Sequence, residues 1–159
     1  MTILLIRHGS AGDPYRWPGD DADRPLDTAG TDQATRLADK VDALLDGRPL
    51  SEVRSSRAIR CLQTVGPTAA RHALLPESDP SLFEGSSSTM TDLVRTRAGA
   101  DDADRRVVVL CSHADVIPDV IRDVVSDGAS LSGGRGCAYA SIWELTVADG
   151  TITHAHYHQ

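Results

Sequence analysis

Residues 3–9 read ILLIRHG and residues 107–113 read VVVLCSH, and these two stretches decide the fold. Each begins with a short, continuous apolar run, which is typical of a strand buried on both faces of a parallel sheet. Each then passes directly into a histidine, His8 in the first stretch and His113 in the second. If the two strands are neighbours, both histidines lie beyond the carboxyl ends of the strands, where open α/β sheets bind their ligands.

Amphipathic stretches outside these two runs predict helices. Apolar residues recur at helical spacing in three stretches, which are residues 34–45, 58–69 and 116–125. A shorter helix is expected around Met90, and a short strand around residues 52–54. Pro67 is expected to kink or divide the helix in which it lies, because proline cannot donate the backbone hydrogen bond of a helix interior.

The end of the chain predicts a hairpin. Residues 138–147 and 151–157 are expected to form its strands, with the turn at Asp149 and Gly150. The alternation of strands and helices before it indicates an α/β fold, namely a three-layer α/β/α sandwich with a mostly parallel central sheet. The C-terminal hairpin is expected to add antiparallel edge strands. No linker is visible, so residues 1–159 are expected to form a single domain.

Composition narrows the possible partners and compartment. Of the 159 residues, 40% are hydrophobic and 25% are charged, which suits one compact globular domain. The net charge of -7 argues against nucleic acid and against an anionic membrane as partners. No apolar run is long enough to cross a bilayer, and the opening residues do not resemble a secretory signal. We therefore expect a cytoplasmic protein, and nothing in the sequence specifies its oligomeric state.

Lysine and cysteine usage excludes two further classes of protein. The only lysine, Lys40, lies in the segment ADKVDA, so the chain has no P-loop for binding a nucleotide. The cysteines form no C-x-x-C pair, which argues against a zinc ribbon or a disulfide framework, and they are expected to be buried apolar residues. They are Cys61, Cys111 and Cys137.

Alternating histidines near the C-terminus could in principle hold a metal ion. His154, His156 and His158 share one face of the last predicted strand, and such a face can bind zinc. A solvated polar edge is the favoured interpretation, because no cysteine or carboxylate lies nearby in sequence to complete a site. We expect no metal and no cofactor.

Arginines at a predicted junction between a strand and a helix point to the chemistry of the site. Arg60 lies where a helix start would direct it to the same edge of the sheet as the two histidines, whereas Arg57 is expected to be a solvated residue of the first turn. A guanidinium group binds two phosphate oxygens at once, so arginines beside histidines at such an edge favour a phosphoryl ligand.

Together these elements resemble the histidine phosphatase superfamily, which has the phosphoglycerate-mutase-like fold. The matching elements occur in the family's order, as Arg7-His8-Gly9, Leu26-Asp27-Thr28-Ala29-Gly30, Ser56 to Thr64, Ser81-Leu82-Phe83-Glu84 and Ser112-His113-Ala114. The chain departs from the family pattern at Asp27, Arg57 and Ala114, where threonine, proline and glycine are usual. The short bacterial phosphohistidine-phosphatase-like members are the most similar.

The chain is also similar to the phosphatase-like domain that follows a Nudix domain in some actinobacterial nucleotide hydrolases. No Nudix domain is expected here, because Met1 directly precedes the first predicted strand. The four scattered glutamates also cannot supply the metal-binding pattern of a Nudix helix.

The resemblance implies a metal-independent phosphatase with His8 as the nucleophile. His8 would form a phosphohistidine that water then hydrolyses, and Arg7, Arg60 and His113 would surround the transferred oxygens. Glu84 would donate a proton to the leaving oxygen and later activate water. Because a carboxyl group is normally ionised at neutral pH, that role requires Glu84 to be partly buried.

The substrate is left open by the sequence. Three kinds of substrate would fit. One is a protein partner that carries phosphohistidine, and the other two are small phosphorylated molecules, namely a sugar phosphate and a nucleotide. We expect Gly9 to let the backbone come close to the phosphoryl group, and the substrate-binding loop from Ser10 to Arg24 to form one wall of the entrance. Arg16 and Arg24 are the expected contacts to the rest of the substrate, although Arg24 could instead only pair with neighbouring aspartates.

Two other functions compete with hydrolysis. A mutase shares the catalytic residues, but it needs insertions that keep water from the phosphohistidine. Only twenty-eight residues separate Glu84 from His113, which favours hydrolysis. A non-catalytic phosphate-binding module would be expected to have lost His8, Arg60 or His113, and all three are present.

Overall fold

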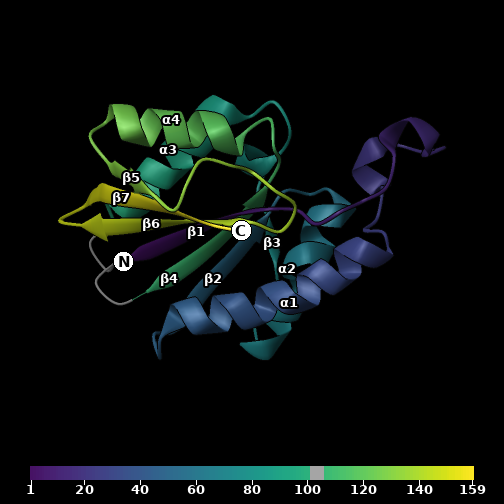
Figure 1. Ribbon diagram of the computed structural model, residues 1–159, viewed down its shortest axis with the longest axis horizontal. Helices are drawn as coiled ribbons and strands as arrows, with labels where there is room; N and C mark the ends of the chain where they lie inside the picture. Colours follow the sequence, from purple (N-terminus) through teal and green to yellow (C-terminus); the bar gives the residue numbers. More distant parts are fainter. Residues whose placement is uncertain (101–105) are drawn as a thin grey trace.

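One mixed sheet of seven strands forms the centre of the computed structural model, which describes residues 1–100 and 106–159 (Figure 1). The strands are β1 (Thr2–Arg7), β2 (Leu50–Ser55), β3 (Glu77–Ser78), β4 (Val107–Ser112), β5 (Ser130–Ser132), β6 (Ile142–Ala148) and β7 (Thr151–His158). Their order across the sheet is β3-β2-β4-β1-β6-β7-β5. The strands from β3 to β1 are parallel, and β6 and β7 continue the sheet as an antiparallel hairpin.

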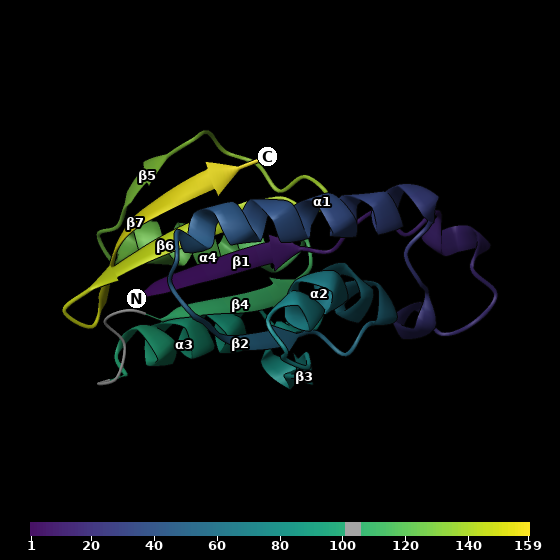
Figure 2. The same cartoon turned by 90° about the horizontal axis from the view of Figure 1, so that it is seen from below.

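Helices cover both faces of the sheet, as Figures 1 and 2 show. The helices are α1 (Thr28–Leu45) and α2 (Ile59–Arg71) on one face, and α3 (Ser87–Ala98) and α4 (Ile117–Ser126) on the other. Three single-turn 3₁₀ helices join them, which are η1 (Pro14–Arg16), η2 (Asp21–Asp23) and η3 (Pro80–Leu82). The predicted three-layer α/β/α sandwich with a C-terminal hairpin is therefore confirmed. None of the helices in residues 1–100 and 106–159 is long and apolar enough to cross a membrane.

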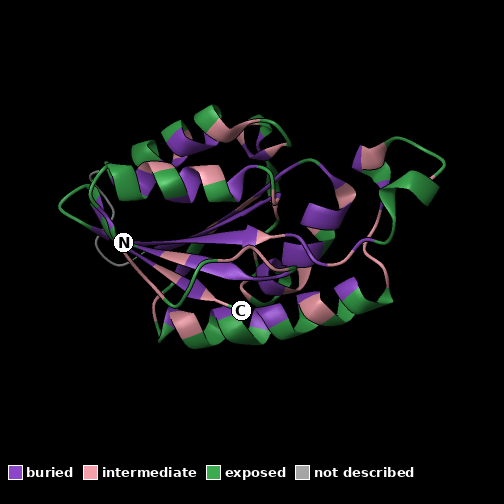
Figure 3. Cartoon of the chain, turned by 45° about the horizontal axis from the view of Figure 1, so that its top comes forward, coloured by how far each residue is buried: buried purple, intermediate pink, exposed green. Residues whose placement is uncertain are grey.

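The central strands are buried on both faces, which explains their continuous apolar sequence. In β1, Ile3 and Leu5 pack with α3 and α4, whereas Leu4 and Ile6 pack with α1 and α2. The residues of β4 alternate between the same two cores. Figure 3 shows these strands buried between helices whose outer faces are exposed. A strand with water on one face would carry polar residues at every second position instead.

Pro67 was expected to kink or divide its helix. The expected division is wrong, because α2 runs without a break from Ile59 to Arg71. The ring of a proline normally clashes with the Cβ of the residue before it, but that residue is Gly66, which has none. Val65 and Ala69 on the same helix are fully buried and hold it against the sheet.

Two strands were not expected from the sequence, and the hairpin begins later than predicted. β3 and β5 are only two and three residues long. β6 starts at Ile142 rather than at residue 138, and residues 138–140 form a loop that lies against the end of β1. The backbone N–H of Ala140 donates to the carbonyl oxygens of Arg7 and His8, at 3.1 and 3.3 Å. This loop therefore borders the residues that follow β1.

Candidate active site

The fold brings His8 and His113 together at one edge of the sheet. β1 and β4 are adjacent and parallel, with Arg7 paired to Ser112, so the residues that follow both strands emerge side by side. The centroids of the two imidazole rings are 5.2 Å apart. Both side chains are buried, and the backbone N–H of His8 donates to the carbonyl oxygen of Ser112 at 3.1 Å.

Two helix side chains fix the turn that follows His8. The hydroxyl of Thr64 in α2 accepts a hydrogen bond from the backbone N–H of Gly9 at 2.9 Å, and it donates to the carbonyl of Arg60 at 2.6 Å. The side-chain oxygen of Gln33 in α1 accepts from the N–H of Ser10 at 2.8 Å. The turn is therefore attached to both helices on one face of the sheet.

Close backbone contact explains the glycine at position 30. A Cβ on Gly30 would lie 1.9 Å from the carbonyl oxygen of Ser10, which no side chain could tolerate. Asp27, just before α1, caps the helix by accepting from the N–H of Gly30 at 2.8 Å, and its other oxygen accepts from the Ser10 hydroxyl at 2.6 Å. The departure from threonine at position 27 thus preserves a helix cap.

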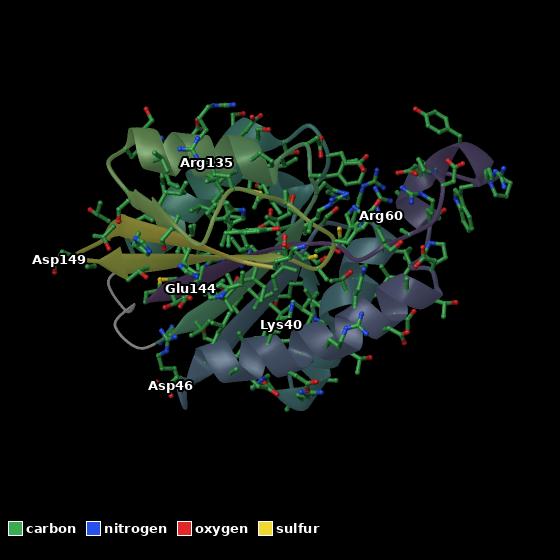
Figure 4. The ribbon with its side chains drawn as sticks, in the orientation of Figure 1. Lys40, Asp46, Arg60, Arg135, Glu144 and Asp149 are labelled. Atoms are coloured by element: carbon green, nitrogen blue, oxygen red, sulfur yellow. The ribbon has the colours of Figure 1, made fainter. Side chains whose placement is uncertain are left out.

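Arg60 is the buried cation of the site. Its side chain is 1% exposed, and it lies at the end of the molecule from which η1 and η2 project (Figure 4). The guanidinium donates to the carbonyl oxygen of Asp21 at 2.7 Å and lies 3.0 Å from the Asp21 carboxylate. It also forms an ion pair with Glu84. Two carboxylates thus occupy the arginine in this structure.

Arg7 is held from the opposite side. Its guanidinium donates to the carbonyl oxygen of Cys137 at 2.6 Å and stacks on the ring of Tyr139, with 3.9 Å between the guanidinium carbon and the ring centroid. The Tyr139 ring also lies 5.9 Å from the ring of His8. Arg7 therefore has a defined orientation beside His8.

Three buried nitrogen atoms at this site have no hydrogen-bond partner among the described residues. They are Nε of Arg7, Nε of Arg60 and Nδ1 of His113. The His113 atom lies 3.3 Å from Glu84, but without hydrogen-bond geometry. An unsatisfied buried donor costs about 1–3 kcal/mol. A group with several acceptor oxygens, such as a phosphoryl group, is the kind of ligand that such donors bind.

His8 is neutral at neutral pH and has its second ring nitrogen available. Burial of the imidazole lowers its pKa to about 3; the cationic groups around it act in the same direction, and the hydrogen bond to Gly9 opposes them. Nδ1 lies 2.7 Å from the carbonyl oxygen of Gly9, which can only accept, so Nδ1 carries the proton. Nε2 therefore holds a free electron pair, as a nucleophile requires.

The ring of His113 is fixed by two residues to which the sequence analysis gave no role in the site. Nε2 of His113 shares a hydrogen bond with the hydroxyl of Ser56 at 2.8 Å, and the Cys61 sulfur lies 3.6 Å from the same nitrogen. Ser56 and Cys61 are fully buried. Because Nε2 is engaged on this inner side, Nδ1 is the nitrogen that faces Glu84.

Glu84 lies beside both Arg60 and His113 but is more exposed than expected. Its side chain is 42% exposed, so the partial burial expected from the sequence is slight. The next residue, Gly85, donates its N–H to the carboxylate of Asp115 at 2.9 Å, which ties the loop to the segment after β4. Glu84 therefore lies between the cations of the site and water.

The predicted substrate-binding residues separate into two groups. Gly9 and Ser10 lie at the site, although the Ser10 hydroxyl is engaged by Asp27. Arg24 is buried and donates to Asp21 at 2.7 Å and to the carbonyl of Ala11 at 2.7 Å, which is the alternative that the sequence also allowed. Arg16, in η1, has a side chain 88% exposed and pairs loosely with Asp13. Substrate contact by these residues stays a prediction.

Two further residues beside the catalytic candidates were missed. Asp21 contacts Arg60, and Tyr139 stacks on Arg7. The sequence held a faint signal for Asp21, which lies three residues before Arg24 and could have been expected to pair with it. It held none for Tyr139, which lies in a loop without periodicity.

The C-terminal histidines do share one face of β7, as predicted. His154 and His156 share hydrogen bonds with Ser132 at 2.7 and 2.6 Å, and His158 pairs with Glu144 at 2.9 Å. Within residues 1–100 and 106–159, no group of three or more histidine, cysteine, aspartate or glutamate side chains is arranged to hold a metal ion. These histidines lie on a strand between β6 and β5, so the sheet edge expected at this place is formed by β5 instead.

The lowered pKa of His8 predicts a loss of stability in mild acid. The unfolded state, with a histidine pKa of about 6.5, binds a proton before the folded state does, so stability falls as the pH drops from 6.5 toward 3. Between pH 7 and pH 5 we expect this histidine to cost about 2 kcal/mol. The measurement is urea unfolding at both pH values for the wild type and for His8→Asn, which cannot titrate. An equal loss in both proteins would contradict the lowered pKa.

Comparison with known proteins gives a family for most of this chain. Residues 3–103 match the model of the histidine phosphatase superfamily, branch 1. The chain is 30% identical over 156 residues to the 8-oxo-(d)GTP phosphatase of Mycolicibacterium smegmatis, and the match covers 98% of this chain and 47% of that protein. The chain therefore spans about half the length of this curated relative.

Solved structures share the fold over nearly the whole chain. The protein histidine phosphatase SixA, in a complex with tungstate, superposes with a TM-score of 0.73 at 18% identity and covers 100% of this chain and 95% of its own. A candidate phosphohistidine phosphatase SixA from Nakamurella multipartitia gives a TM-score of 0.69 at 25% identity, with coverage of 99% and 93%.

Proposed function

Because this chain belongs to the histidine phosphatase superfamily, branch 1, we propose that it hydrolyses a phosphomonoester or a phosphoramidate through a phosphohistidine on His8, without a metal ion. The family and its phosphatase relatives support phosphatase activity. The observation that carries the mechanism is a neutral His8 with Nε2 free, surrounded by unsatisfied donors of Arg7, Arg60 and His113.

In the first step, Nε2 of His8 attacks phosphorus while the bond between phosphorus and the leaving group breaks. The leaving atom, which is an oxygen in a phosphomonoester and a nitrogen in a phosphoramidate, takes a proton from Glu84, and Arg7, Arg60 and His113 hold the three phosphoryl oxygens. The imidazole becomes positively charged when it is phosphorylated. The carbonyl of Gly9, which accepts from Nδ1–H, stabilises that charge.

In the second step, water attacks the phosphohistidine and breaks the bond between phosphorus and nitrogen. The Glu84 carboxylate takes a proton from this water, so it regains the proton that it gave up in the first step. His8 returns to its neutral form with Nδ1 protonated, and inorganic phosphate leaves. The cycle is balanced without a metal ion, since cationic side chains supply the positive charge.

Hydrolysis is favoured over mutase chemistry because the described residues that follow Glu84 do not cover the site. The described residues between Glu84 and His113 form α3 and β4, and α3 packs against α4 and the sheet rather than over the two histidines. The Glu84 side chain is itself partly exposed to water. We propose further that residues 1–159 act as one domain, since a single sheet joins β1 to β7.

The substrate class is proposed from the relatives. One is named a protein histidine phosphatase and another an 8-oxo-(d)GTP phosphatase, so a phosphohistidine protein and a nucleotide are the first candidates. A sugar phosphate remains a third. All three present a terminal phosphoryl group, which is the part that the site described above would hold.

The test is phosphate release in the presence of EDTA. The panel consists of p-nitrophenyl phosphate, a sugar phosphate, a nucleotide and a phosphohistidine peptide. We expect release from at least one substrate, unaffected by EDTA, together with a phosphoenzyme that survives alkali and decays in acid, as a phosphoramidate does. Release that requires a metal ion, or a phosphoenzyme that is stable in acid, would contradict the proposal. Binding of inorganic phosphate without any turnover would instead favour the non-catalytic module.

A further inference from the structure

We infer that Ser56 is a positioning residue of the active site, which acts through His113. By donating a hydrogen bond to Nε2, the Ser56 hydroxyl keeps the proton of the neutral imidazole on Nδ1, the nitrogen that faces Glu84. The inference rests on the proposed function, because the phosphoryl group is placed beside His8 and His113. It adds to the mechanism a residue that does not itself contact the substrate.

Ser56 lies at the junction between β2 and α2, on the inner side of His113. It is fully buried, and its hydroxyl oxygen lies 2.8 Å from Nε2 of His113. The backbone N–H of Ser56 donates to the carbonyl oxygen of Cys111 at 2.9 Å, in the strand that leads to His113. Two segments far apart in the sequence are therefore joined at this point, which holds the hydroxyl against the imidazole.

The direction of this hydrogen bond follows from the other partner of the hydroxyl. The N–H of Ala58 donates to the Ser56 hydroxyl oxygen at 3.3 Å, so that oxygen already accepts one hydrogen bond. Among the described residues, Nε2 of His113 is the only acceptor within reach of the hydroxyl hydrogen. A buried hydroxyl hydrogen without an acceptor costs free energy. The hydroxyl therefore donates, and Nε2 accepts with a free electron pair.

The outer nitrogen of His113 supports the same assignment. Nδ1 is buried and lies 3.3 Å from the Glu84 carboxylate, without hydrogen-bond geometry. That carboxylate attracts a protonated nitrogen and repels a lone pair. A neutral imidazole carries one proton, and the hydrogen bond made by one nitrogen decides which nitrogen holds it. Ser56 therefore makes Nδ1 a donor, as the binding of a phosphoryl oxygen requires, whereas a lone pair on Nδ1 would repel that oxygen.

Cys61 is the second neighbour of Nε2, with its sulfur 3.6 Å away. In the thiol form, Cys61 donates to the carbonyl oxygen of Ser112 at 3.8 Å, so its hydrogen points away from the imidazole. Burial raises the pKa of this thiol, but hydrogen bonds with Cys111 and His113 oppose burial and lower it to about 6. A thiolate would draw a proton to Nε2 and so compete with Ser56. We assign the role to Ser56 because its hydroxyl is closer to Nε2 and is a stronger donor than a thiol.

The experiment measures which nitrogen of His113 carries the proton, by ¹⁵N NMR of the imidazole at pH 7. Protonated and unprotonated ring nitrogens differ in chemical shift, and the signals of His113 are those that disappear in His113→Asn. In the wild type we expect Nδ1 to be protonated and Nε2 to be unprotonated. In Ser56→Ala we expect Nε2 to be protonated in at least part of the molecules. Ser56→Thr keeps the hydroxyl and should restore the wild-type signals.

The same variants give a kinetic result. Ser56→Ala should lower kcat/KM about 10- to 100-fold, which is the usual effect of removing the group that orients a functional histidine. The factor should be the same for p-nitrophenyl phosphate and for a sugar phosphate, since both present the same phosphoryl group to Nδ1.

Ser55→Ala is the matched control for the loss of a buried hydroxyl. Ser55 is fully buried as well, but its hydroxyl donates to the carbonyl oxygen of Ser56 at 2.8 Å rather than to His113. This variant should leave the ¹⁵N signals of His113 and kcat/KM close to those of the wild type.

Three results would overturn the inference. A proton on Nε2 in the wild type, alone or together with one on Nδ1, would show that Ser56 accepts rather than donates, and this result does not depend on the folding of Ser56→Ala. An equal loss of kcat/KM in Ser55→Ala and Ser56→Ala would show a purely structural role. ¹⁵N signals that change in Cys61→Ala but not in Ser56→Ala would assign the role to the thiol. Failure of the proposed function would appear separately, as absence of phosphate release by a wild type whose His113 signals are as expected.

Discussion

His8→Ala is expected to lower kcat by a factor of about 10⁴ or more on every substrate of the enzyme, while the protein stays folded. Loss of the nucleophile removes the covalent path altogether, and what remains is the electrostatic effect of the surrounding cations on direct attack by water. No neighbouring group can replace the imidazole. The Ser10 hydroxyl donates to Asp27, and the Cys61 thiol is fully buried on the inner side of His113.

The measurement is phosphate release by wild type and His8→Ala side by side, with urea unfolding at pH 7 to show that the variant is folded. Inorganic phosphate should still bind the variant, since Arg7, Arg60 and His113 remain. Cys61→Ala is the chemical control, and it should retain most of the turnover. A His8→Ala rate within tenfold of the wild type would remove the mechanism, and loss of turnover only in Cys61→Ala would point to a thiol nucleophile.

The parts of this molecule that the sequence predicted are those in which one physical constraint dominates. Continuous apolar runs such as residues 3–6 and 107–111 fit strands that are covered on both faces, so their central places followed from the pattern. Their adjacency was only assumed, and the pairing of β1 with β4 shows it. Once β1 and β4 were neighbours, His8 and His113 had to meet. The family resemblance then supplied the order of the remaining elements, and the family model confirms that recognition.

The parts that escaped prediction depend on contacts between distant segments. β5 is too short to show a strand pattern, and it is held by pairing with β7 and by hydrogen bonds that Ser130 and Ser132 share with histidines of that strand. Sequence could not decide whether Arg24 reaches a substrate or Asp21, since that depends on where η2 lies. Tyr139 reaches Arg7 only because a strained loop folds back over the end of β1.

Glu84→Gln is expected to separate substrates by their leaving groups. With a sugar or alkyl phosphate, whose leaving oxygen must be protonated as the bond breaks, kcat/KM should fall about 10²–10⁴-fold. With p-nitrophenyl phosphate, whose leaving group is stable as an anion, the fall should be less than about 10-fold. Glutamine keeps the size of the side chain and an oxygen that can accept from Arg60, so what the change removes is the proton and the charge.

Asp21→Asn tests whether the effect of Glu84→Gln comes from the lost proton or from the lost negative charge. Asp21 contacts the same guanidinium nitrogen of Arg60 as Glu84, and the two carboxylates are equally exposed, at 42%. A hydrogen bond from Arg24, together with the charge of Arg60, holds the pKa of Asp21 below its ordinary value, so Asp21 contributes a negative charge beside Arg60. Removing the charge of Asp21 should therefore change kcat/KM by a similar factor for all substrates.

The two variants together give a decisive comparison of roles. If Glu84 acts only by neutralising the charge of Arg60 and orienting His113, Glu84→Gln and Asp21→Asn will each change kcat/KM by the same factor for every substrate. In that case the assignment of Glu84 as the acid is wrong. If Glu84 donates the proton, only Glu84→Gln will steepen the dependence of kcat/KM on the leaving group. We expect the second outcome, because Glu84 is the carboxylate that contacts both Arg60 and His113, at 3.3 Å from the latter.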